Sequence, residues 1–147
     1  MITISQKAKN LIQGNYLADL VSLMPDGSPH IAPVWYKYDG KHYLILTEPN
    51  TTKVRNINND GRIAILVSTP SPPYAYVMVK GRGEISESNH SELLTELSIK
   101  YLGETEGKEY ADKMLVSSEF VLITLVPNKI IEYFDSTIIT QPNAIDN

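Results

Sequence analysis

The sequence predicts a mainly β fold in which six or seven antiparallel strands form a barrel and short helices lie between them. Asp-Gly pairs separate runs rich in β-branched and aromatic residues, as at residues 26–27 and 39–40, which is typical of hairpin turns. Residues 63–67 are all apolar, which favours a strand covered on both faces. Closing the sheet into a barrel would remove exposed strand edges.

A short helix opens the predicted fold, because apolar residues recur at helical spacing over residues 5–13 and Gly14 follows as a stop signal. Strand patterns then alternate with turn residues. We expect an antiparallel meander of three strands over residues 16–24, 30–38 and 41–47.

The next strands are expected at residues 62–68 and 74–87. Between them lies a loop at residues 70–73, because its three prolines cannot donate hydrogen bonds to a ladder. Within the second strand, Gly81 and Gly83 indicate a bulge or a close approach of backbone.

Two amphipathic helices and two strands complete the prediction. The first helix begins near Asn89 and ends at Leu102, and the second covers residues 108–117 after a break at residues 103–107. The last strands are expected at residues 120–126 and 130–134, with a turn at residues 127–129.

The composition is that of one soluble domain over residues 1–147, with a core at about 5–134 and a polar tail at 136–147. The 13 basic and 17 acidic residues give a net charge of -4, which argues against binding to nucleic acid or to an anionic membrane. The absence of cysteine excludes disulfides and thiolate chemistry. No apolar run has the length of a signal peptide or membrane span, so we expect a cytoplasmic protein.

The start of a helix expected to end near Asn59 is the strongest candidate for a binding site. Pro49 ends a strand, and Thr51 or Thr52 can cap the helix. Free N–H groups, the helix dipole and the charges of Lys53 and Arg55 would favour a phosphate. Ordinary capping with a solvated cationic face is the alternative, since the segment lacks the glycines of the known phosphate loops.

Trp35 and Tyr36, close to Pro33, allow two interpretations. They could pack in the core, or they could form a wall for a flat aromatic ligand. Pro33 suits the second interpretation, because it withdraws one N–H from the ladder. No metal site is expected, because the three histidines have no ligand spacing among them.

Several motifs follow one another in a defined order, and they are Asp26-Gly27-Ser28-Pro29-His30, Pro33-Val34-Trp35-Tyr36, Asp39-Gly40, Thr47, Thr52-Lys53-Val54-Arg55-Asn56-Ile57, Asp60-Gly61-Arg62, Val79-Lys80-Gly81, Lys100-Tyr101-Leu102-Gly103 and Glu109-Tyr110-Ala111 with Met114. Over residues 5–134 this set resembles the pyridoxamine-phosphate-oxidase-like split β-barrel superfamily. Within that superfamily it is most similar to flavin- or deazaflavin (F420)-dependent oxidoreductases. The last two motifs resemble a helical insert of the F420 branch, which favours F420 slightly over FMN.

The resemblance implies an FMN-binding type of split barrel that forms a homodimer with two cofactor sites at the interface. For the cofactor phosphate it implies Lys53, with Thr51, Thr52, Arg55 and Asn56 around it. For the flat ring system it implies Pro33, Val34, Trp35 and Thr47.

The expected activity is hydride transfer between F420 or FMN and a small organic substrate, with no catalytic acid or base assigned. His30, Tyr36 and Lys37 are candidates for the substrate pocket. A non-catalytic carrier or storage protein for F420, FMN or heme is the alternative, and heme would require a histidine such as His30. True pyridoxamine phosphate oxidases carry arginines at the position aligned with Ala32 and just before the glycine aligned with Gly81, so we do not expect that activity here.

Overall fold

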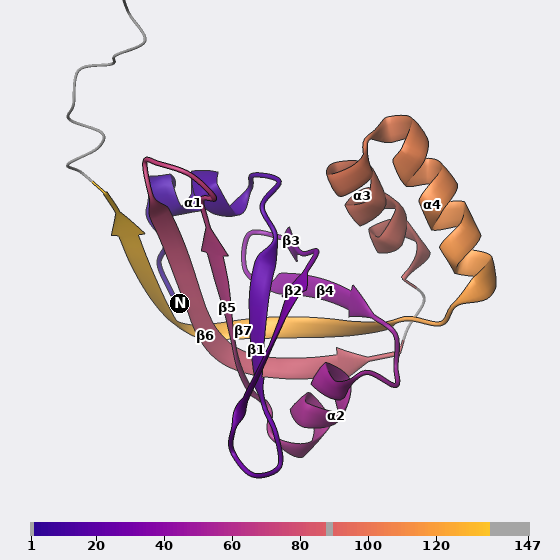
Figure 1. The fold of residues 1–147 in the computed structure, drawn as a ribbon, viewed down its shortest axis with the longest axis horizontal. Coiled ribbons are helices and arrows are strands. Elements are labelled where there is room, and N and C mark those ends of the chain that lie inside the picture. The colour runs from indigo at the N-terminus through magenta and orange to yellow at the C-terminus, as the bar shows by residue number, and fades with distance from the viewer. Residues whose placement is uncertain (1, 88–89, 136–147) are drawn as a thin grey trace, which may run out of the picture.

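Seven antiparallel strands form a curled half-barrel sheet with four short helices in the computed structural model, which describes residues 2–87 and 90–135 (Figure 1). The mainly β, antiparallel fold class is therefore confirmed. In chain order the elements are α1 (Gln6–Ile12), β1 (Ala18–Leu23), β2 (Pro29–Val34), β3 (Lys37–Tyr38), β4 (Tyr43–Thr47), α2 (Thr52–Asn59), β5 (Arg62–Ser68), β6 (Ala75–Ser86), α3 (Ser91–Leu102), α4 (Glu104–Ser117) and β7 (Val121–Phe134).

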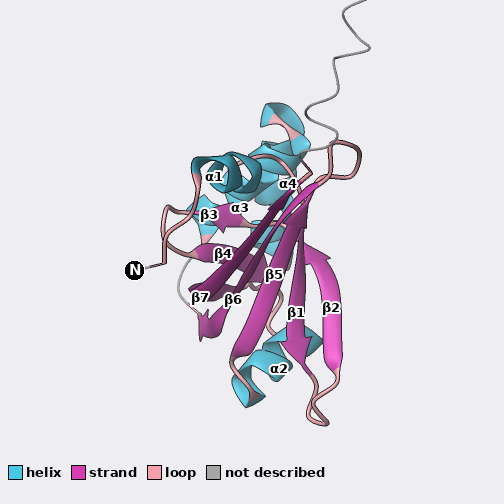
Figure 2. Ribbon diagram, turned by 90° about the vertical axis from the view of Figure 1, so that its left-hand side faces the viewer, coloured by secondary structure: helices cyan, strands magenta, loops and turns pink. Residues whose placement is uncertain are grey.

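The strands follow the order β2-β1-β5-β6-β7-β4-β3, so β2 and β3 are the two edges of an open sheet. Figure 2 shows α1 near one end of the strands and α2 near the other. The α3–α4 hairpin stands to one side of the sheet in Figure 1. None of the described helices is long and apolar enough to cross a membrane.

One predicted strand supplies both edges of this sheet. The strand expected over residues 30–38 ends at Val34, and the chain then crosses to the opposite edge, where Lys37 and Tyr38 pair with β4. The crossing is stabilised by Tyr36, whose side chain is fully buried in the core and whose hydroxyl donates to the carbonyl of Ile12.

The sequence predicts that residues 63–67 form a strand covered on both faces, but within one chain only one face of β5 is buried. Ile63, Ile65 and Val67 are buried in the core, whereas the alternating Ala64 and Leu66 are only half-buried. The apolar character of the second face is thus not explained by contacts within one chain.

Strand β7 is continuous, so the turn predicted at residues 127–129 is wrong. Its register with β6 shifts between Lys80 and Gly81, where Lys80 pairs with Lys129 and Gly81 with Pro127. A bulge of this kind tolerates proline, because a ladder hydrogen bond is already missing there. The irregularity expected at Gly81 is confirmed.

Helix α4 begins at Glu104, so the break predicted over residues 103–107 is too long. Gly107 lies inside the helix and is buried, and a Cβ atom built on it would lie 2.6 Å from the backbone nitrogen of Ile99. Glycine here permits close packing of α3 on α4 rather than ending a helix. The predicted helix start at Asn89 and the polar tail at 136–147 lie outside the described residues.

Candidate cofactor site

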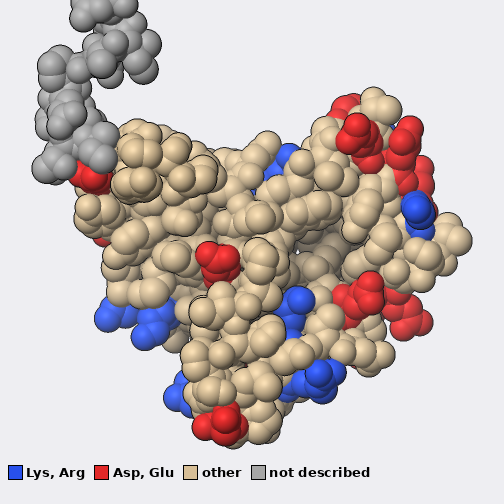
Figure 3. Space-filling view, viewed as in Figure 1, with Lys and Arg blue, Asp and Glu red and all other residues tan. Residues whose placement is uncertain are grey.

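A cavity of about 260 Å³ lies where the ends of β2 and β4 meet the start of α2 and the α3–α4 hairpin. It is lined by Pro33, Val34, Trp35, Leu46, Thr47, Lys53, Leu94, Leu97, Tyr110 and Phe120. Figure 3 shows the molecule hollowed between the α3–α4 hairpin and the sheet, with Lys and Arg side chains on its lower side. Five residues chosen from the sequence for cofactor binding are therefore brought together here, and they are Pro33, Val34, Trp35, Thr47 and Lys53.

Lys53 places a half-buried positive charge in this cavity. Within residues 2–87 and 90–135 its ammonium has no hydrogen bond or ion pair. Burial lowers the pKa of Lys53, and the nearby carboxylate of Glu48 opposes that shift. A partly desolvated cation without a direct partner is the group that an anionic ligand would stabilise.

The start of α2 leaves backbone donors beside Lys53. Thr51 occupies the N-cap position, but its side chain makes no capping hydrogen bond. Its hydroxyl donates instead to the carbonyl of Glu48 at 3.2 Å and lies 3.5 Å from the Thr47 hydroxyl. The first turn of α2 therefore keeps its partial positive charge and uncapped N–H groups next to the lysine.

Arg55 and Asn56 do not line the cavity, and they stabilise the loop and helix that present Lys53. The Arg55 guanidinium donates to the carbonyl of Asn50 at 2.8 Å and to the Thr52 hydroxyl at 3.2 Å. Asn56 is buried, and its amide donates to the Ser22 hydroxyl at 3.1 Å, which links α2 to β1. Thr52 is thus engaged by Arg55 in this structure.

Aromatic side chains form another part of the cavity wall. The Trp35 ring stacks on Tyr101 with centroids 5.1 Å apart and an interplanar angle of 9°, and it meets Tyr110 at 5.6 Å with the rings tilted. Tyr101 donates its hydroxyl to the carbonyl of Tyr16 at 2.9 Å. This cluster fixes α3 against the crossing between β2 and β3, and it presents Trp35 and Tyr110 to the cavity.

Sequence reasoning missed half of the lining residues, namely Leu46, Leu94, Leu97, Tyr110 and Phe120. The leucines of α3 have the spacing of ordinary core residues, so nothing in their pattern indicates a cavity. Only the resemblance of the α4 motif to a helical insert pointed toward Tyr110.

The three substrate-pocket candidates are dispersed. Tyr36 is a core residue with its hydroxyl bonded to the carbonyl of Ile12, and its side chain does not line the cavity. The Lys37 ammonium forms an ion pair with Glu96 at 2.5 Å outside the cavity. His30 lies on β2 opposite Ser22, and its Nδ1 atom is buried without a hydrogen-bond partner.

Lys100 joins α3 to the same crossing. Its ammonium donates to the carbonyl of Tyr36 at 2.8 Å and lies 4.3 Å from the centre of the Tyr36 ring and 4.9 Å from that of Tyr101. Burial lowers the pKa of Lys100 to about 8. The hairpin that covers the cavity is therefore attached through a group that titrates in the mildly alkaline range.

The stability of the wild-type protein is expected to rise at alkaline pH, and the Lys100→Met variant is expected to lack this rise. The pKa of Lys100 is 10.5 when the side chain is free and about 8 in the folded protein. Between these values the unfolded chain binds more protons, so wild-type stability should increase with pH relative to the variant, which cannot titrate there. Thermal unfolding of both proteins at about pH 7 and about pH 9.5 measures this effect. If the Tm difference between wild type and variant is the same at the two pH values, the prediction is contradicted.

The curled, open antiparallel sheet is a split half-barrel, and the α3–α4 hairpin lies beside a cavity that contains Lys53. The family model described as pyridoxamine 5'-phosphate oxidase matches residues 4–133. The chain therefore belongs to the pyridoxamine 5'-phosphate oxidase family.

Solved structures share the fold at low sequence identity. An F420 reductase is 22% identical with a TM-score of 0.71, over 87% of this chain and 98% of that one. Rv2991, a conserved hypothetical protein from Mycobacterium tuberculosis, is 21% identical with a TM-score of 0.75, over 98% and 93%. General Stress Protein 26 from Bacillus anthracis str. Sterne is 23% identical with a TM-score of 0.65, over 88% and 95%.

Proposed function

We propose that the protein is an oxidoreductase that binds F420 or FMN in the Lys53 cavity and transfers a hydride between that cofactor and a small organic substrate. The observation that carries the proposal is the half-buried ammonium of Lys53, which has no direct partner among the described residues and lies beside the uncapped start of α2. This arrangement suits a phosphate group. Family membership and the fold shared with an F420 reductase support the proposal.

The residues present fit such a cofactor. Lys53 and the first turn of α2 would hold its phosphate, while Trp35 and Tyr110 would lie along its ring system. When bound, the cofactor would supply the hydride chemistry itself. The chain would contribute binding, orientation of the ring and exclusion of water from one of its faces.

The test is a titration of cofactor-free protein with F420 and with FMN in parallel, at physiological salt, followed by cofactor fluorescence. Saturable binding of either at one molecule per chain is the expected result. Oxidation of the reduced cofactor by electron-poor organic substrates then tests turnover. If neither cofactor binds, the proposal fails, and if one binds but no substrate is reduced, the protein is a carrier.

Heme binding is less well supported than F420 or FMN binding. All three histidines belong to the described residues, and the cavity lining contains none of them. A heme in this cavity would therefore lack a histidine ligand from this chain.

A homodimer with the cofactor at its interface is part of the proposal. The cavity is small for a complete cofactor, since small-molecule sites usually have about 300–1,000 Å³. On the outer face of the sheet, Leu66 pairs with Met78 and Met78 with Ile131, all half-buried, while Ile31 is 63% exposed. Pro33, on the exposed side of β2, joins this apolar face to the cavity. A second copy packed on the face would enlarge the site.

The Met78→Glu variant is expected to be a folded monomer under conditions in which the wild-type protein is a dimer. The new carboxylate would be buried between apolar residues in the dimer but hydrated in the monomer. Sedimentation velocity at matched concentrations gives the assembly state, and circular dichroism gives folding. Val116→Glu is the matched control, because Val116 is 90% exposed on α4. A wild-type monomer, or a dimeric Met78→Glu variant, would contradict the assignment of this face.

A further inference from the structure

A cavity of about 630 Å³ is distinct from the proposed cofactor cavity, and the two share no lining residue. Its wall is formed by the N-terminal segment, α1, the turn between β3 and β4, and the part of β7 that contains the bulge. Figure 2 shows the N-terminal segment, α1, β3 and β4 on the same side of the molecule. The volume is within the usual range of small-molecule sites.

Tyr43 lines this cavity with a fully buried side chain, and its hydroxyl has no hydrogen-bond partner among the described residues. The two tyrosines whose rings lie beside it are satisfied. The Tyr38 hydroxyl donates to the carbonyl of Gly40 at 2.9 Å, and the Tyr36 hydroxyl donates to that of Ile12. Burial raises the pKa of Tyr43, so its hydroxyl stays protonated and can donate. An unpaired buried donor is costly, and an oxygen atom of a ligand would satisfy it.

Lys9 on α1 and Lys41 in the β3–β4 turn bring positive charge to the same cavity. Neither ammonium has a hydrogen bond or ion pair within the described part of the chain, and the lining contains no aspartate or glutamate. Asp39 belongs to the turn, but it accepts from the backbone N–H groups of Lys41 at 2.9 Å and His42 at 2.6 Å. The cavity therefore presents cations without a carboxylate to pair with them, which favours an anionic ligand.

Apolar side chains form much of the remaining wall, including those of Ile4, Tyr38, Val126 and Ile130. Ile4, Tyr38 and Ile130 are half-buried and pack against the core. A ligand with an apolar body would remove their exposed surface from water, which is favourable.

We propose that this cavity binds a small carboxylic acid with an apolar body. The carboxylate would pair with Lys9 and Lys41, and an oxygen atom of the ligand would accept the hydrogen bond of the Tyr43 hydroxyl. The apolar body would lie against the isoleucines of the wall. The site does not depend on the proposed function, because it shares no residue with the cofactor cavity.

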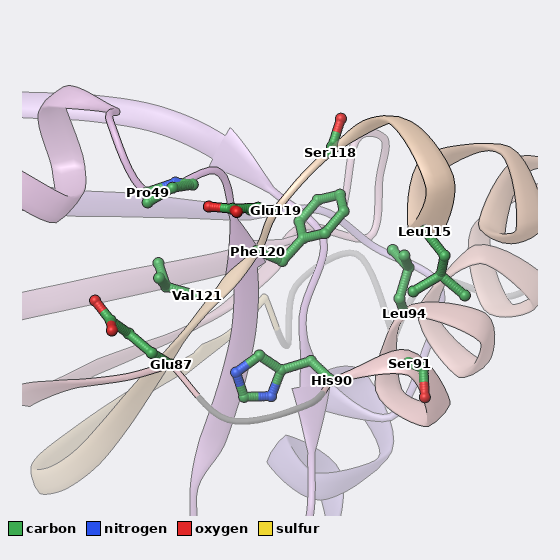
Figure 4. Close-up of a pocket in the computed structure, with 10 residues that line it drawn as sticks. All are labelled: Pro49, Glu87, His90, Ser91, Leu94, Leu115, Ser118, Glu119, Phe120 and Val121. Carbon is green, nitrogen blue, oxygen red and sulfur yellow. The ribbon is translucent and has the colours of Figure 1, made fainter.

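A cavity of opposite character lies at the start of α3 (Figure 4). Its volume is about 440 Å³, and its lining contains Glu87 and Glu119 but no lysine or arginine. A carboxylate should be repelled by these glutamates and attracted by Lys9 and Lys41. The two cavities therefore provide an internal comparison for the position of an anionic probe.

Three probes of similar shape test the proposal on cofactor-free protein, and they are phenylacetate, phenylacetamide and phenethylamine. Titrations followed by NMR of methyl-labelled protein give each Kd and locate the site. Phenylacetate is expected to bind at least about fivefold more tightly than the neutral amide, and the cationic amine is expected to bind weakest. Shifts are expected at Ile4, Val126 and Ile130 and not at Leu94 or Leu115. Equal affinities, no measurable phenylacetate binding, or shifts confined to other methyl groups would overturn the proposal.

The Tyr43→Phe variant tests the role of the unpaired hydroxyl. Without ligand its Tm should equal or exceed that of the wild type, because a buried donor without a partner is removed. Its affinity for phenylacetate and for phenylacetamide should fall at least about threefold. Tyr36→Phe is the matched control, since it removes a bonded hydroxyl outside the cavity and should lower the Tm without changing either affinity. Wild-type affinity in a folded Tyr43→Phe protein would overturn the proposal.

The Lys9→Met/Lys41→Met double variant separates charge recognition from apolar contact. It should weaken phenylacetate binding at least about fivefold and leave phenylacetamide binding unchanged. Lys129→Met is the control, because Lys129 is exposed beside Asn128 of the wall but does not line the cavity. An equal effect of the control and the double variant would overturn the proposal. These titrations contain no cofactor, so their result is independent of the F420 and FMN titrations that test the proposed function.

Discussion

Replacing Lys53 with alanine is expected to weaken binding of F420 or FMN at least about tenfold, which corresponds to about 1.4 kcal/mol. The variant removes the charged group of the cavity wall that has no direct partner among the described residues. Because that charge is half-buried, its contact with a phosphate would be less screened than one at an exposed site. The backbone donors of α2 would remain, so binding should be weakened rather than abolished. Fluorescence titration of both proteins with the same cofactor measures the effect.

Two further variants show whether the effect is local. Lys53→Arg retains the charge and should recover part of the lost affinity, although the guanidinium presents it with a different geometry. Lys113→Ala removes a lysine from the exposed surface of α4 and should bind like the wild-type protein. Unfolding curves establish that each variant is folded. A folded Lys53→Ala variant with unchanged affinity would exclude the start of α2 as the phosphate site.

The site could be predicted from the sequence only where local chemistry determined it. The sequence around Lys53 predicts a helix start with a basic side chain, and Pro33 predicts a strand with a missing N–H donor. Both residues line the cavity. Leu94 and Phe120 have no such local signal. Their role depends on where the α3–α4 hairpin and the start of β7 lie relative to β2, β4 and α2, which is a long-range property of the fold.

The errors in the fold prediction have one physical origin. Gly107 and Pro127 were taken as breakers of helix and strand, but each lies inside an element at a point where the backbone makes a special contact. Gly107 permits close packing of two helices, and Pro127 lies at the bulge of β7. Tyr36 illustrates the same difficulty. The sequence predicts one strand over residues 30–38, but the buried ring of Tyr36 divides this segment into β2 and β3.

The Gly81→Ala variant is expected to lose at least about 3 kcal/mol of folding free energy. A Cβ atom built on Gly81 would lie 2.1 Å from the carbonyl oxygen of Val126 and 2.9 Å from the Cα atom of Pro127. Both atoms belong to the backbone of the paired strand, so no side-chain rotation can relieve the contact. The strands β6 and β7 would have to separate at the bulge.

Urea denaturation of Gly81→Ala and Gly61→Ala compares a blocked position with an open one. A Cβ atom at Gly61 would have no neighbour closer than 3.5 Å, so that variant should be unchanged or more stable by up to about 1 kcal/mol. The loss of folding free energy in Gly81→Ala should be accompanied by weaker cofactor binding. Strand β6 leads into α3, and β7 begins beside Phe120, so separation of the two strands would displace both sides of the cavity. Equal stability of the two variants would contradict the close approach at the bulge. A destabilised but folded Gly81→Ala protein with wild-type affinity would show instead that the cavity does not depend on the bulge.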